Sequence, residues 1–261
     1  MAERPPRILA IAGSDSSGGA GIQADIKTIT MLGGYAMTAI TVVTAQNSRG
    51  VRGVESLSPD FVAAQVDACM EDIGVDAVKI GMLGSADIAE VVADRLEDLP
   101  CPIVFDPVMV ATSGSVLADE ETVEVFEWLM ELATLTTPNV PELEALGGAA
   151  AMAERGVAYL AKGGDAEGPM VEDRLVRPGM GDAVWTEARI VTKHTHGTGC
   201  TLSSAIATHL ARGLPLEDAV AEARRFVREA LLAAPGYGLG NGPLGHQAVR
   251  DGQGCAASGE A

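Results

Sequence analysis

The chain has 261 residues, of which 47% are hydrophobic, so it is long enough to bury the core of one large α/β domain or two small ones. Its formal net charge is −18, and a surface this acidic repels phosphate backbones and anionic lipid, so we expect neither a nucleic acid partner nor a membrane partner. An anionic small molecule is compatible with this charge, because clustered backbone N–H groups bind anions locally.

Cysteine usage and the N-terminus indicate a reduced, unexported protein. The four cysteines are far apart and form no CxxC pair, so the sequence predicts neither a zinc site nor a disulfide framework. The apolar run near the N-terminus is too short for a signal peptide, and no run of about 18 apolar residues follows it. We therefore expect a soluble, cytoplasmic protein.

The chain opens with a strand, a loop and a helix. Residues 7–13, RILAIAG, predict a buried strand, which runs into the glycine- and serine-rich loop GSDSSGGAG and then into a helix over 22–32. Residues 35–46 are rich in β-branched side chains and predict a second strand.

The same alternation continues to the C-terminal third. Residues 58–73 predict a helix with Ser58 as its N-cap and Pro59 at its first position. The later expected elements are strands over 77–83, 103–109, 135–139 and 156–164, an extended segment over 184–197, and helices over 85–99, 120–133, 201–212 and 216–234.

Strands that alternate with helices of about 10 to 15 residues predict right-handed crossovers and a mainly parallel sheet covered on both faces. The fold class is therefore α/β, and we expect one domain over residues 1–246 and a disordered tail over 247–261. Ligands of such sheets bind beyond the carboxyl ends of the strands. The loops GSDSSGGAG, AQNSRG, GML, DPVM and TPNVPE should thus share one rim.

The glycine-rich loop that begins at Gly13 is not a nucleotide motif of a common type. It lacks the spacing of GxGxxG and the lysine of a P-loop, so a dinucleotide-dependent oxidoreductase is disfavoured. A flexible turn between strand and helix is the alternative interpretation. Asp25 follows in the first turns of the helix, where a polar side chain is often solvated.

The stretch HGTGC carries more information. Gly197 and Gly199 can bring backbone N–H groups together at a helix N-terminus, where the partial positive charge favours a transferring phosphoryl group. The same field should lower the pKa of Cys200 from about 8.5 towards neutrality, where it could act as a general base. The alternative is a small buried residue at a helix start. His194 and His196 lack a third metal ligand nearby, so we interpret both as structural.

Polar residues at three further strand ends suit magnesium and phosphate. Asp106, Asn139 and Glu142 lie on the expected rim, and carboxylates so placed can hold Mg²⁺ through water. Lys162, in AKGGD, is a cation that could face a triphosphate. Each of them could instead be a turn residue, a helix cap or a solvated side chain.

Taken together and in order, AIAGSDSSGGAGIQADIKT, TAQNSRGV, VKIGML, DPVM, TPNVPE, KGGD and TKHTHGTGCTLSSAIA strongly resemble the hydroxymethylpyrimidine/phosphomethylpyrimidine kinases of thiamine biosynthesis, members of the ribokinase-like superfamily. The resemblance covers residues 7 to 246. It implies a three-layer α/β/α sandwich, ATP and Mg²⁺ as cofactors, a small pyrimidine substrate and a homodimer.

The resemblance also assigns roles to residues of this chain. The matching pyrimidine ligands are Gly13, Asp25, Gln46 and Met82, with Val108 as a neighbouring wall. Gln46 suits that task because its amide is both donor and acceptor. Cys200 would activate the hydroxymethyl group, Gly197, Thr198 and Gly199 would cradle the phosphoryl group, Asp106 and Glu142 would hold Mg²⁺, and Asp106, Asn139, Glu142 and Lys162 would lie on the nucleotide side.

Two departures from the family pattern accompany the resemblance. KGGD stands where KGGH is usual, and only residues 147–155 separate NVPELEAL from the next expected strand. The short segment predicts a truncated helix and an exposed apolar face that a neighbour or partner must cover. The expected function is phosphorylation of 4-amino-5-hydroxymethyl-2-methylpyrimidine and then of its monophosphate. The alternatives are a pyridoxal kinase and a pyrimidine-binding module without catalysis.

Overall fold

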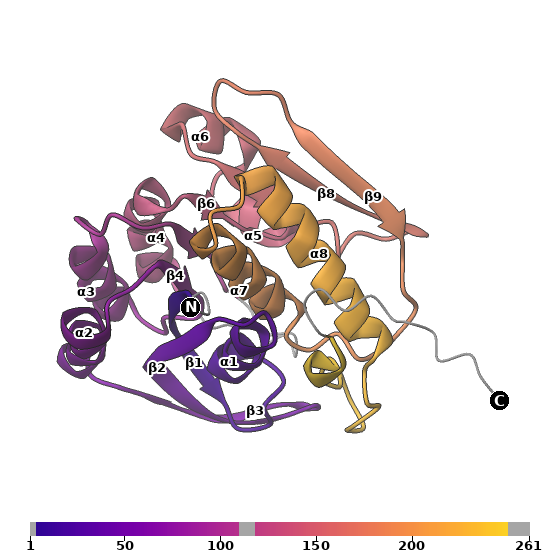
Figure 1. Ribbon diagram of the computed structural model, residues 1–261, viewed down its shortest axis with the longest axis horizontal. Helices are drawn as coiled ribbons and strands as arrows, with labels where there is room; N and C mark the ends of the chain where they lie inside the picture. Colours follow the sequence, from indigo (N-terminus) through magenta and orange to yellow (C-terminus); the bar gives the residue numbers. More distant parts are fainter. Residues whose placement is uncertain (1–3, 110–117, 250–261) are drawn as a thin grey trace.

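The computed structural model describes residues 4–109 and 118–249, and within these ranges nine strands form one sheet (Figure 1). The strands are β1 (Arg7–Asp15), β2 (Tyr35–Asn47), β3 (Gly50–Ser56), β4 (Ala77–Ile80), β5 (Ile103–Phe105), β6 (Leu135–Thr136), β7 (Tyr159–Ala161), β8 (Met170–Val176) and β9 (Ala183–Ala188). Their order in the sheet is β3-β2-β1-β4-β5-β6-β7-β8-β9. The six strands from β2 to β7 in this order are parallel, whereas β3, β8 and β9 join antiparallel at the two edges.

Helices cover both faces of the sheet. They are α1 (Gly21–Met31), α2 (Pro59–Ala68), α3 (Ala86–Leu96), α4 (Glu120–Leu132), α5 (Val140–Ala145), α6 (Gly148–Arg155), α7 (Thr198–Ala211) and α8 (Leu216–Leu232), with a π-helical turn η1 (Cys69–Ile73) and a 3₁₀ turn η2 (His246–Ala248). Helices α2, α3 and α4 pack on one face, and α1, α7 and α8 pack on the other (Figure 1). The expected three-layer α/β/α arrangement with a mainly parallel sheet is confirmed.

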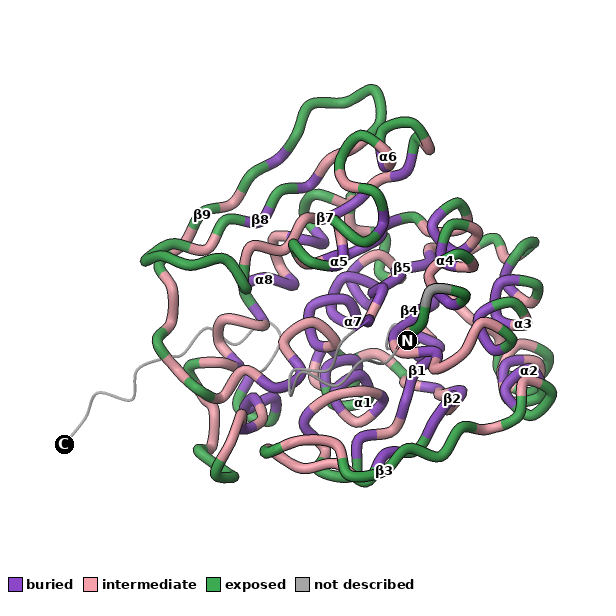
Figure 2. Tube along the Cα trace, turned by 180° about the vertical axis from the view of Figure 1, so that it is seen from behind, coloured by how far each residue is buried: buried purple, intermediate pink, exposed green. Residues whose placement is uncertain are grey.

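The alternation of side chains along β1 explains why its sequence is apolar throughout. Leu9 and Ile11 belong to the core under α2, α3 and α4, whereas Ile8 and Ala10 belong to the core under α1, α7 and α8. Because successive side chains of a strand point to opposite faces, a strand covered on both sides needs apolar residues at every position. The buried path of the central strands is visible in Figure 2.

The predicted start of the second helix is confirmed. The hydroxyl of Ser58 accepts a hydrogen bond from the backbone N–H of Phe61 at 3.3 Å, and Pro59 takes the first helical position. The helix expected to run to residue 73 becomes π-helical at Cys69 and ends at Gly74, whose φ is +78°.

Strands β3 and β8 were not predicted from the sequence. Most residues of β3 are exposed, and in β8 charged residues interrupt the apolar pattern, so neither segment shows the alternation of a half-buried strand. Both strands form by pairing with a neighbour that precedes or follows them directly along the chain.

The expectation of an exposed apolar face beside residues 147–155 was wrong. This segment forms α6, whose Met152 is fully buried in the same core as α4, and Leu146 before it is 4% exposed. Arg155 at the end of α6 pairs with Glu127 on α4. A short helix is thus enough to close this part of the sheet.

The C-terminal end of the described chain is folded three residues further than expected. Turn η2 contains Gln247 and Ala248, and Val249 is 3% exposed in the core beside α8. The rest of the expected tail, 250–261, lies outside the described residues. No helix among residues 4–109 and 118–249 has the length and apolar character needed to cross a membrane.

Candidate active site

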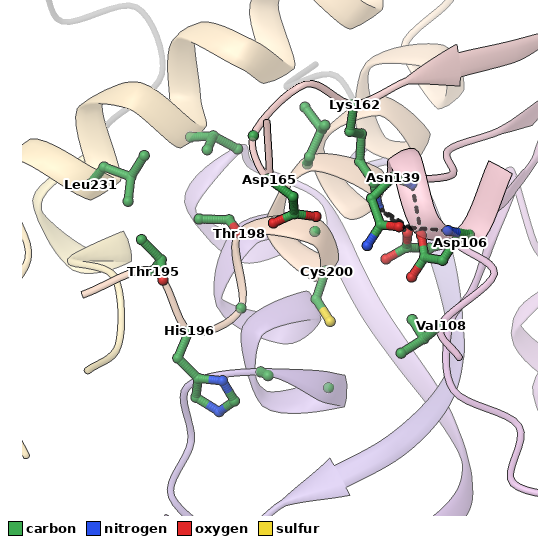
Figure 3. Close-up of a pocket in the computed structure, with 18 of the residues that line it drawn as sticks. Asp106, Val108, Asn139, Lys162, Asp165, Thr195, His196, Thr198, Cys200 and Leu231 are labelled. Carbon is green, nitrogen blue, oxygen red and sulfur yellow. Dashed lines mark hydrogen bonds and ion pairs between the residues drawn. The ribbon is translucent and has the colours of Figure 1, made fainter. Parts of the chain in front are cut away.

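A cavity of about 810 Å³ lies beyond the carboxyl ends of the parallel strands (Figure 3). All of the predicted site residues except Asp25 line it: Gly13, Gln46, Met82, Asp106, Val108, Asn139, Glu142, Lys162, Gly197, Thr198, Gly199 and Cys200. They come from the C-terminal ends of β1 and β2, from the segments after β4, β5, β6 and β7, and from the start of α7. The sheet topology therefore brings together residues that are up to 187 positions apart, from Gly13 to Cys200.

The N-terminus of α7 forms the floor of the cavity. The helix begins at Thr198, three residues before the predicted start, so that Thr198, Gly199 and Cys200 make its first turn. The first N–H groups of a helix have no partner inside it and carry partial positive charge. Gly197, the N-cap, has a φ of +91°, and a Cβ there would lie 1.9 Å from the carbonyl oxygen of Gly19. Only glycine lets this turn lie against the loop before α1.

The expected lowering of the Cys200 pKa was wrong. The thiol lies in the first turn of α7, but burial raises its pKa to about 11, and the buried carboxylates of Asp25 and Asp106 act in the same direction. The ammonium group of Lys79 and the backbone N–H of Gly21 counteract part of this shift. Removal from water therefore outweighs the helix N-terminus, and Cys200 is a protonated thiol near neutral pH.

The structure does not place Asp25 on the cavity. Its carboxylate is fully buried behind the wall, 3.0 Å from the Nζ of Lys79, and it accepts a hydrogen bond from the hydroxyl of Ser204 at 2.7 Å. Burial raises the pKa of Asp25, while Lys79 opposes the rise. The expected direct contact between Asp25 and a pyrimidine is thus replaced by an ion pair that supports the wall beneath Cys200.

At the other end of the cavity, one lysine holds two carboxylates. The Nζ of Lys162 lies 2.7 Å from Asp106 and 3.7 Å from Glu142 (Figure 3). The hydroxyl of Thr137 donates to the same oxygen of Asp106, Oδ1, at 3.1 Å, so Oδ2 is left on the side of Gly199. Burial raises the pKa of Glu142 and the charge of Lys162 opposes the rise.

Asn139 and Glu142 form a capping box at the start of α5. The Asn139 side chain accepts from the N–H of Glu142 at 2.8 Å, and the Glu142 carboxylate accepts from the N–H of Asn139 at 2.8 Å. These two hydrogen bonds fix the shape of the loop before α5. Asp106 and Glu142 are oxygen donors of the kind that Mg²⁺ prefers, and two carboxylates suffice when phosphates and water complete the shell, so the residues fit this ion. No cluster of three or more metal-binding side chains occurs within the described ranges.

The apolar end of the cavity, between β9 and α8, was not predicted from the sequence. Ile190, Val227 and Leu231 line it, and Leu231 is labelled in Figure 3. Below them, Arg224 donates to Asp173 at 2.7 Å, and Asp173 accepts from the N–H of Gly163 next to Lys162. An apolar slot with a few fixed polar groups is typical of a site for a flat ring. The amphipathic period of α8 gives no signal for this role, because these residues also suit a core.

The opposite end holds two residues that the sequence analysis did not assign to the site, Asp15 and His196. The Nε2 of His196 lies 3.0 Å from a carboxylate oxygen of Asp15 and 3.3 Å from the side-chain amide of Gln46, and all three residues line the cavity. His196 was interpreted as structural. The clustering of donors after Asp15, in DSSGGA, is the only local signal that could have indicated a shaped anion-bearing loop here.

The chain is similar to a known family of kinases and to several of its members. The family model for phosphomethylpyrimidine kinase matches residues 15–245. The thiamine biosynthesis bifunctional protein ThiED of Geobacter sulfurreducens is 45% identical over 255 residues, which are 92% of this chain and 52% of that protein. A hydroxymethylpyrimidine/phosphomethylpyrimidine kinase of Streptomyces coelicolor is 43% identical over 256 residues, which are 93% of this chain and 94% of that protein. The chain thus spans about half the length of the first relative and nearly all of the second.

Two solved structures are similar in fold. An ADP complex of Bacillus subtilis pyridoxal kinase superposes with a TM-score of 0.84 at 33% identity and covers 94% of this chain and 98% of that chain. A phosphomethylpyrimidine kinase from Clostridium difficile superposes with a TM-score of 0.73 at 38% identity and covers 86% and 99%. The ribokinase-like fold expected from the sequence is confirmed by these likenesses.

Proposed function

The chain belongs to the phosphomethylpyrimidine kinase family, and from this premise we propose that it transfers a phosphoryl group from ATP to the hydroxymethyl group of 4-amino-5-hydroxymethyl-2-methylpyrimidine and then phosphorylates the monophosphate. One observation carries the proposal. The first turn of α7, with Cys200, lines the same cavity as the amide of Gln46 and the ammonium group of Lys162.

The chain's own residues suffice to orient both reactants. Gln46 pairs with the aminopyrimidine edge, and Met82 and Val108 form apolar walls around the ring. The N–H groups of Gly199 and Cys200 face the phosphoryl group in transfer, where fixed dipoles stabilise developing charge without reorganising. Catalysis of this type rests on positioning and charge neutralisation.

Cys200 is the proton acceptor for the substrate hydroxyl. Burial raises the pKa of the Cys200 thiol to about 11 and the charge of Lys79 opposes the rise, so the thiolate has to form as the hydroxyl is deprotonated. Phosphoryl transfer through a loose transition state requires the hydroxyl proton to leave late. The proposal therefore requires that the rate follow the fraction of Cys200 in the thiolate form.

The nucleotide lies between α8 and Lys162. Ile190, Val227 and Leu231 contact the base, and Lys162 contacts the phosphates. Asp106 and Glu142 would hold Mg²⁺ together with water. The ion, when bound, neutralises charge on the ATP phosphates.

Phosphorylation of pyridoxal is the second candidate function. The observation in its favour is the likeness to the Bacillus subtilis pyridoxal kinase, whose TM-score of 0.84 exceeds the 0.73 of the phosphomethylpyrimidine kinase from Clostridium difficile. The higher sequence identity of the second structure, 38% against 33%, favours the pyrimidine. We further propose a homodimer and a cytoplasmic location, and sedimentation of the purified protein tests the first.

The test is direct. Purified protein is incubated with ATP and Mg²⁺ and, separately, with the hydroxymethylpyrimidine, its monophosphate and pyridoxal, and the products are identified by mass. Turnover of both pyrimidines supports the proposal, whereas turnover of pyridoxal alone moves the assignment to the second candidate. Binding of the pyrimidine without turnover of any substrate leaves a binding module without catalysis.

A further inference from the structure

Asp15 is a fixed acceptor at the substrate end of the cavity. Its carboxylate accepts from the backbone N–H groups of Ser17 at 2.8 Å and of Gly19 and Ala20 at 2.9 Å, and also from the hydroxyl of Ser17. Burial opposes the charge, but the hydrogen bonds from His196 and from the loop hold the pKa of Asp15 well below its usual range. The group is therefore an ionised carboxylate, which can only accept hydrogen bonds.

The proton on His196 follows from this. Its Nε2 lies 3.0 Å from Oδ2 of Asp15, and two acceptors at that distance would repel, so Nε2 carries a hydrogen. The ring has no room to turn away. It is 5% exposed, and a Cβ on Gly19 would lie 2.4 Å from its Cδ2. Its backbone N–H is also fixed, by donation to the carbonyl of Gly242 at 3.1 Å.

The same count of protons decides which way the amide of Gln46 faces. The terminal atom of Gln46 placed as nitrogen lies 3.3 Å from His196 Nε2, and the atom placed as oxygen lies 3.2 Å from the Thr44 hydroxyl. An amide N–H cannot donate to a nitrogen that already carries a hydrogen. The hydroxyl group of Thr44 has one hydrogen, which it donates to the carbonyl of Ser14 at 3.0 Å, so it has none left to donate to Gln46. Oxygen and nitrogen of an amide are assigned from such networks.

Turning the amide by 180° removes both conflicts. The one hydrogen on Nε2 of His196, which points to Asp15, is then shared with the amide oxygen of Gln46, the Gln46 nitrogen donates to the Thr44 hydroxyl, and Thr44 donates to Ser14. We propose that the Asp15–His196 pair fixes this orientation of the Gln46 amide, and that His196 is thereby a positioning residue that selects an aminopyrimidine over pyridoxal. The inference rests on the proposed function and names what determines its substrate.

The orientation matters because the substrate edge has a direction. In the hydroxymethylpyrimidine, the amino group sits on the carbon between a ring nitrogen and the carbon that bears the hydroxymethyl group. A carboxamide pairs with this edge by accepting from the amino group and donating to the ring nitrogen. With its oxygen on the His196 side, Gln46 would place the amino group, and the hydroxymethyl group next to it, on the side of the loop that runs from His196 to Cys200.

A reversed amide would direct the hydroxymethyl group away from Cys200. Pyridoxal has no amino group beside its ring nitrogen, so it cannot use both halves of the fixed amide. A site built to pair with a polar edge rejects an analogue that leaves one of its groups unpaired. Loss of the His196 N–H should therefore harm the pyrimidine reaction more than the pyridoxal reaction.

The kinetic test compares His196→Leu with His196→Gln. Leucine removes the donor, and we expect KM for the hydroxymethylpyrimidine to rise roughly 10- to 100-fold while KM for ATP changes less than about twofold. The preference for the pyrimidine over pyridoxal should fall at least about tenfold. Glutamine keeps an N–H within reach of Asp15 and should restore most of the preference. Equal losses for both substrates, or no rescue by glutamine, would overturn the proposal.

Ser17→Ala is the matched control. It removes a hydroxyl from the same carboxylate of Asp15 but leaves the contact between His196 and Gln46 intact. We expect the preference between the two substrates to stay within about twofold of the unmodified protein. A fall as large as that of His196→Leu would assign the effect to the loop rather than to the amide.

A second measurement does not depend on turnover. The chain has four histidines, and ¹⁵N spectra of histidine-labelled protein, with His196→Gln to assign the signal, report which ring nitrogen carries hydrogen. We expect hydrogen on Nε2 of His196 in the unmodified protein and its loss from Nε2 in Asp15→Asn, because asparagine can donate to that nitrogen. An Nε2 without hydrogen in the unmodified protein overturns the inference. If none of the three substrates is phosphorylated in the incubation with ATP and Mg²⁺, the proposed function is refuted, whatever the ¹⁵N spectra show.

Discussion

Buried His246 should make the protein lose stability in mild acid. Its Nε2 lies 2.8 Å from the hydroxyl of Thr201, whose hydrogen goes to the carbonyl of Gly197 at 2.7 Å, so Nε2 must donate and Nδ1 must be unprotonated. Nδ1 is buried and has no hydrogen-bond partner of good geometry among the described residues, and the backbone of Leu244 opposes only part of the lowering of the His246 pKa. Burial, with the nearby charge of Lys27, lowers the pKa of His246 to about 4 from 6.5.

The sign and size of the effect follow from linkage. Between pH 6.5 and 4 the unfolded chain binds a proton at this histidine and the folded chain does not, so the free energy of unfolding falls as the pH falls. From pH 7 to pH 5 this one group removes about 2 kcal/mol of stability. The loss is complete only below the folded pKa.

Urea unfolding at pH 7 and pH 5 of the unmodified protein and of His246→Gln tests the reasoning. Glutamine can still donate to Thr201 but cannot bind a proton, so its loss of stability between the two pH values should be smaller by about 2 kcal/mol. Carboxylates contribute equally to both proteins and cancel in the comparison. Equal losses in the two proteins would show that His246 is accessible to protons in the folded state.

Three further predictions concern the cavity and its supports. Gly197→Ala should destabilise the protein by several kcal/mol more than Gly213→Ala in urea unfolding, because both positions have positive φ but only the first meets a carbonyl, at 1.9 Å; equal costs would refute the close approach. Lys79→Met should cost about 3 to 5 kcal/mol by leaving the charge of Asp25 buried without an opposite charge, and Lys79→Met with Asp25→Asn should cost less; a larger cost for the double variant would contradict this. Cys200→Ala should lower kcat by roughly 10²- to 10⁴-fold and abolish its rise with pH from 7 to 9, because the thiol with a pKa raised to about 11 is then absent; a pH profile that keeps its slope in the variant would remove the role of Cys200 as base.

The sequence could predict the layers of the fold because that information is local. The apolar run before Gly13 and the cap at Ser58 each depend on neighbouring residues, and both elements form as expected. Strands β3 and β8 depend on pairing with another strand, and their exposed residues carry no period. The rim position of the site also followed from the sequence, since every parallel strand delivers its loop to the same edge.

The partners within the site could not be predicted. Asp25 and Lys79 are 54 positions apart, and Asp15 and His196 are 181 positions apart. Nothing in the sequence near either acid shows which cation or ring it meets. The pair Asn139 and Glu142 is the opposite case, because N-x-x-E before a helix indicates a capping box by itself.

Cys200 shows why a correct motif can still give a wrong pKa. The helix N-terminus stabilises a thiolate by an effect that falls off within one turn and is worth about 1 kcal/mol. Desolvation of the thiol acts on the same equilibrium with the larger effect, so the pKa rises to about 11. The thiol that is proposed to accept the hydroxyl proton therefore holds its own proton at neutral pH in this structure. The pH profile of kcat measures how far bound ATP and substrate change the balance between these two effects.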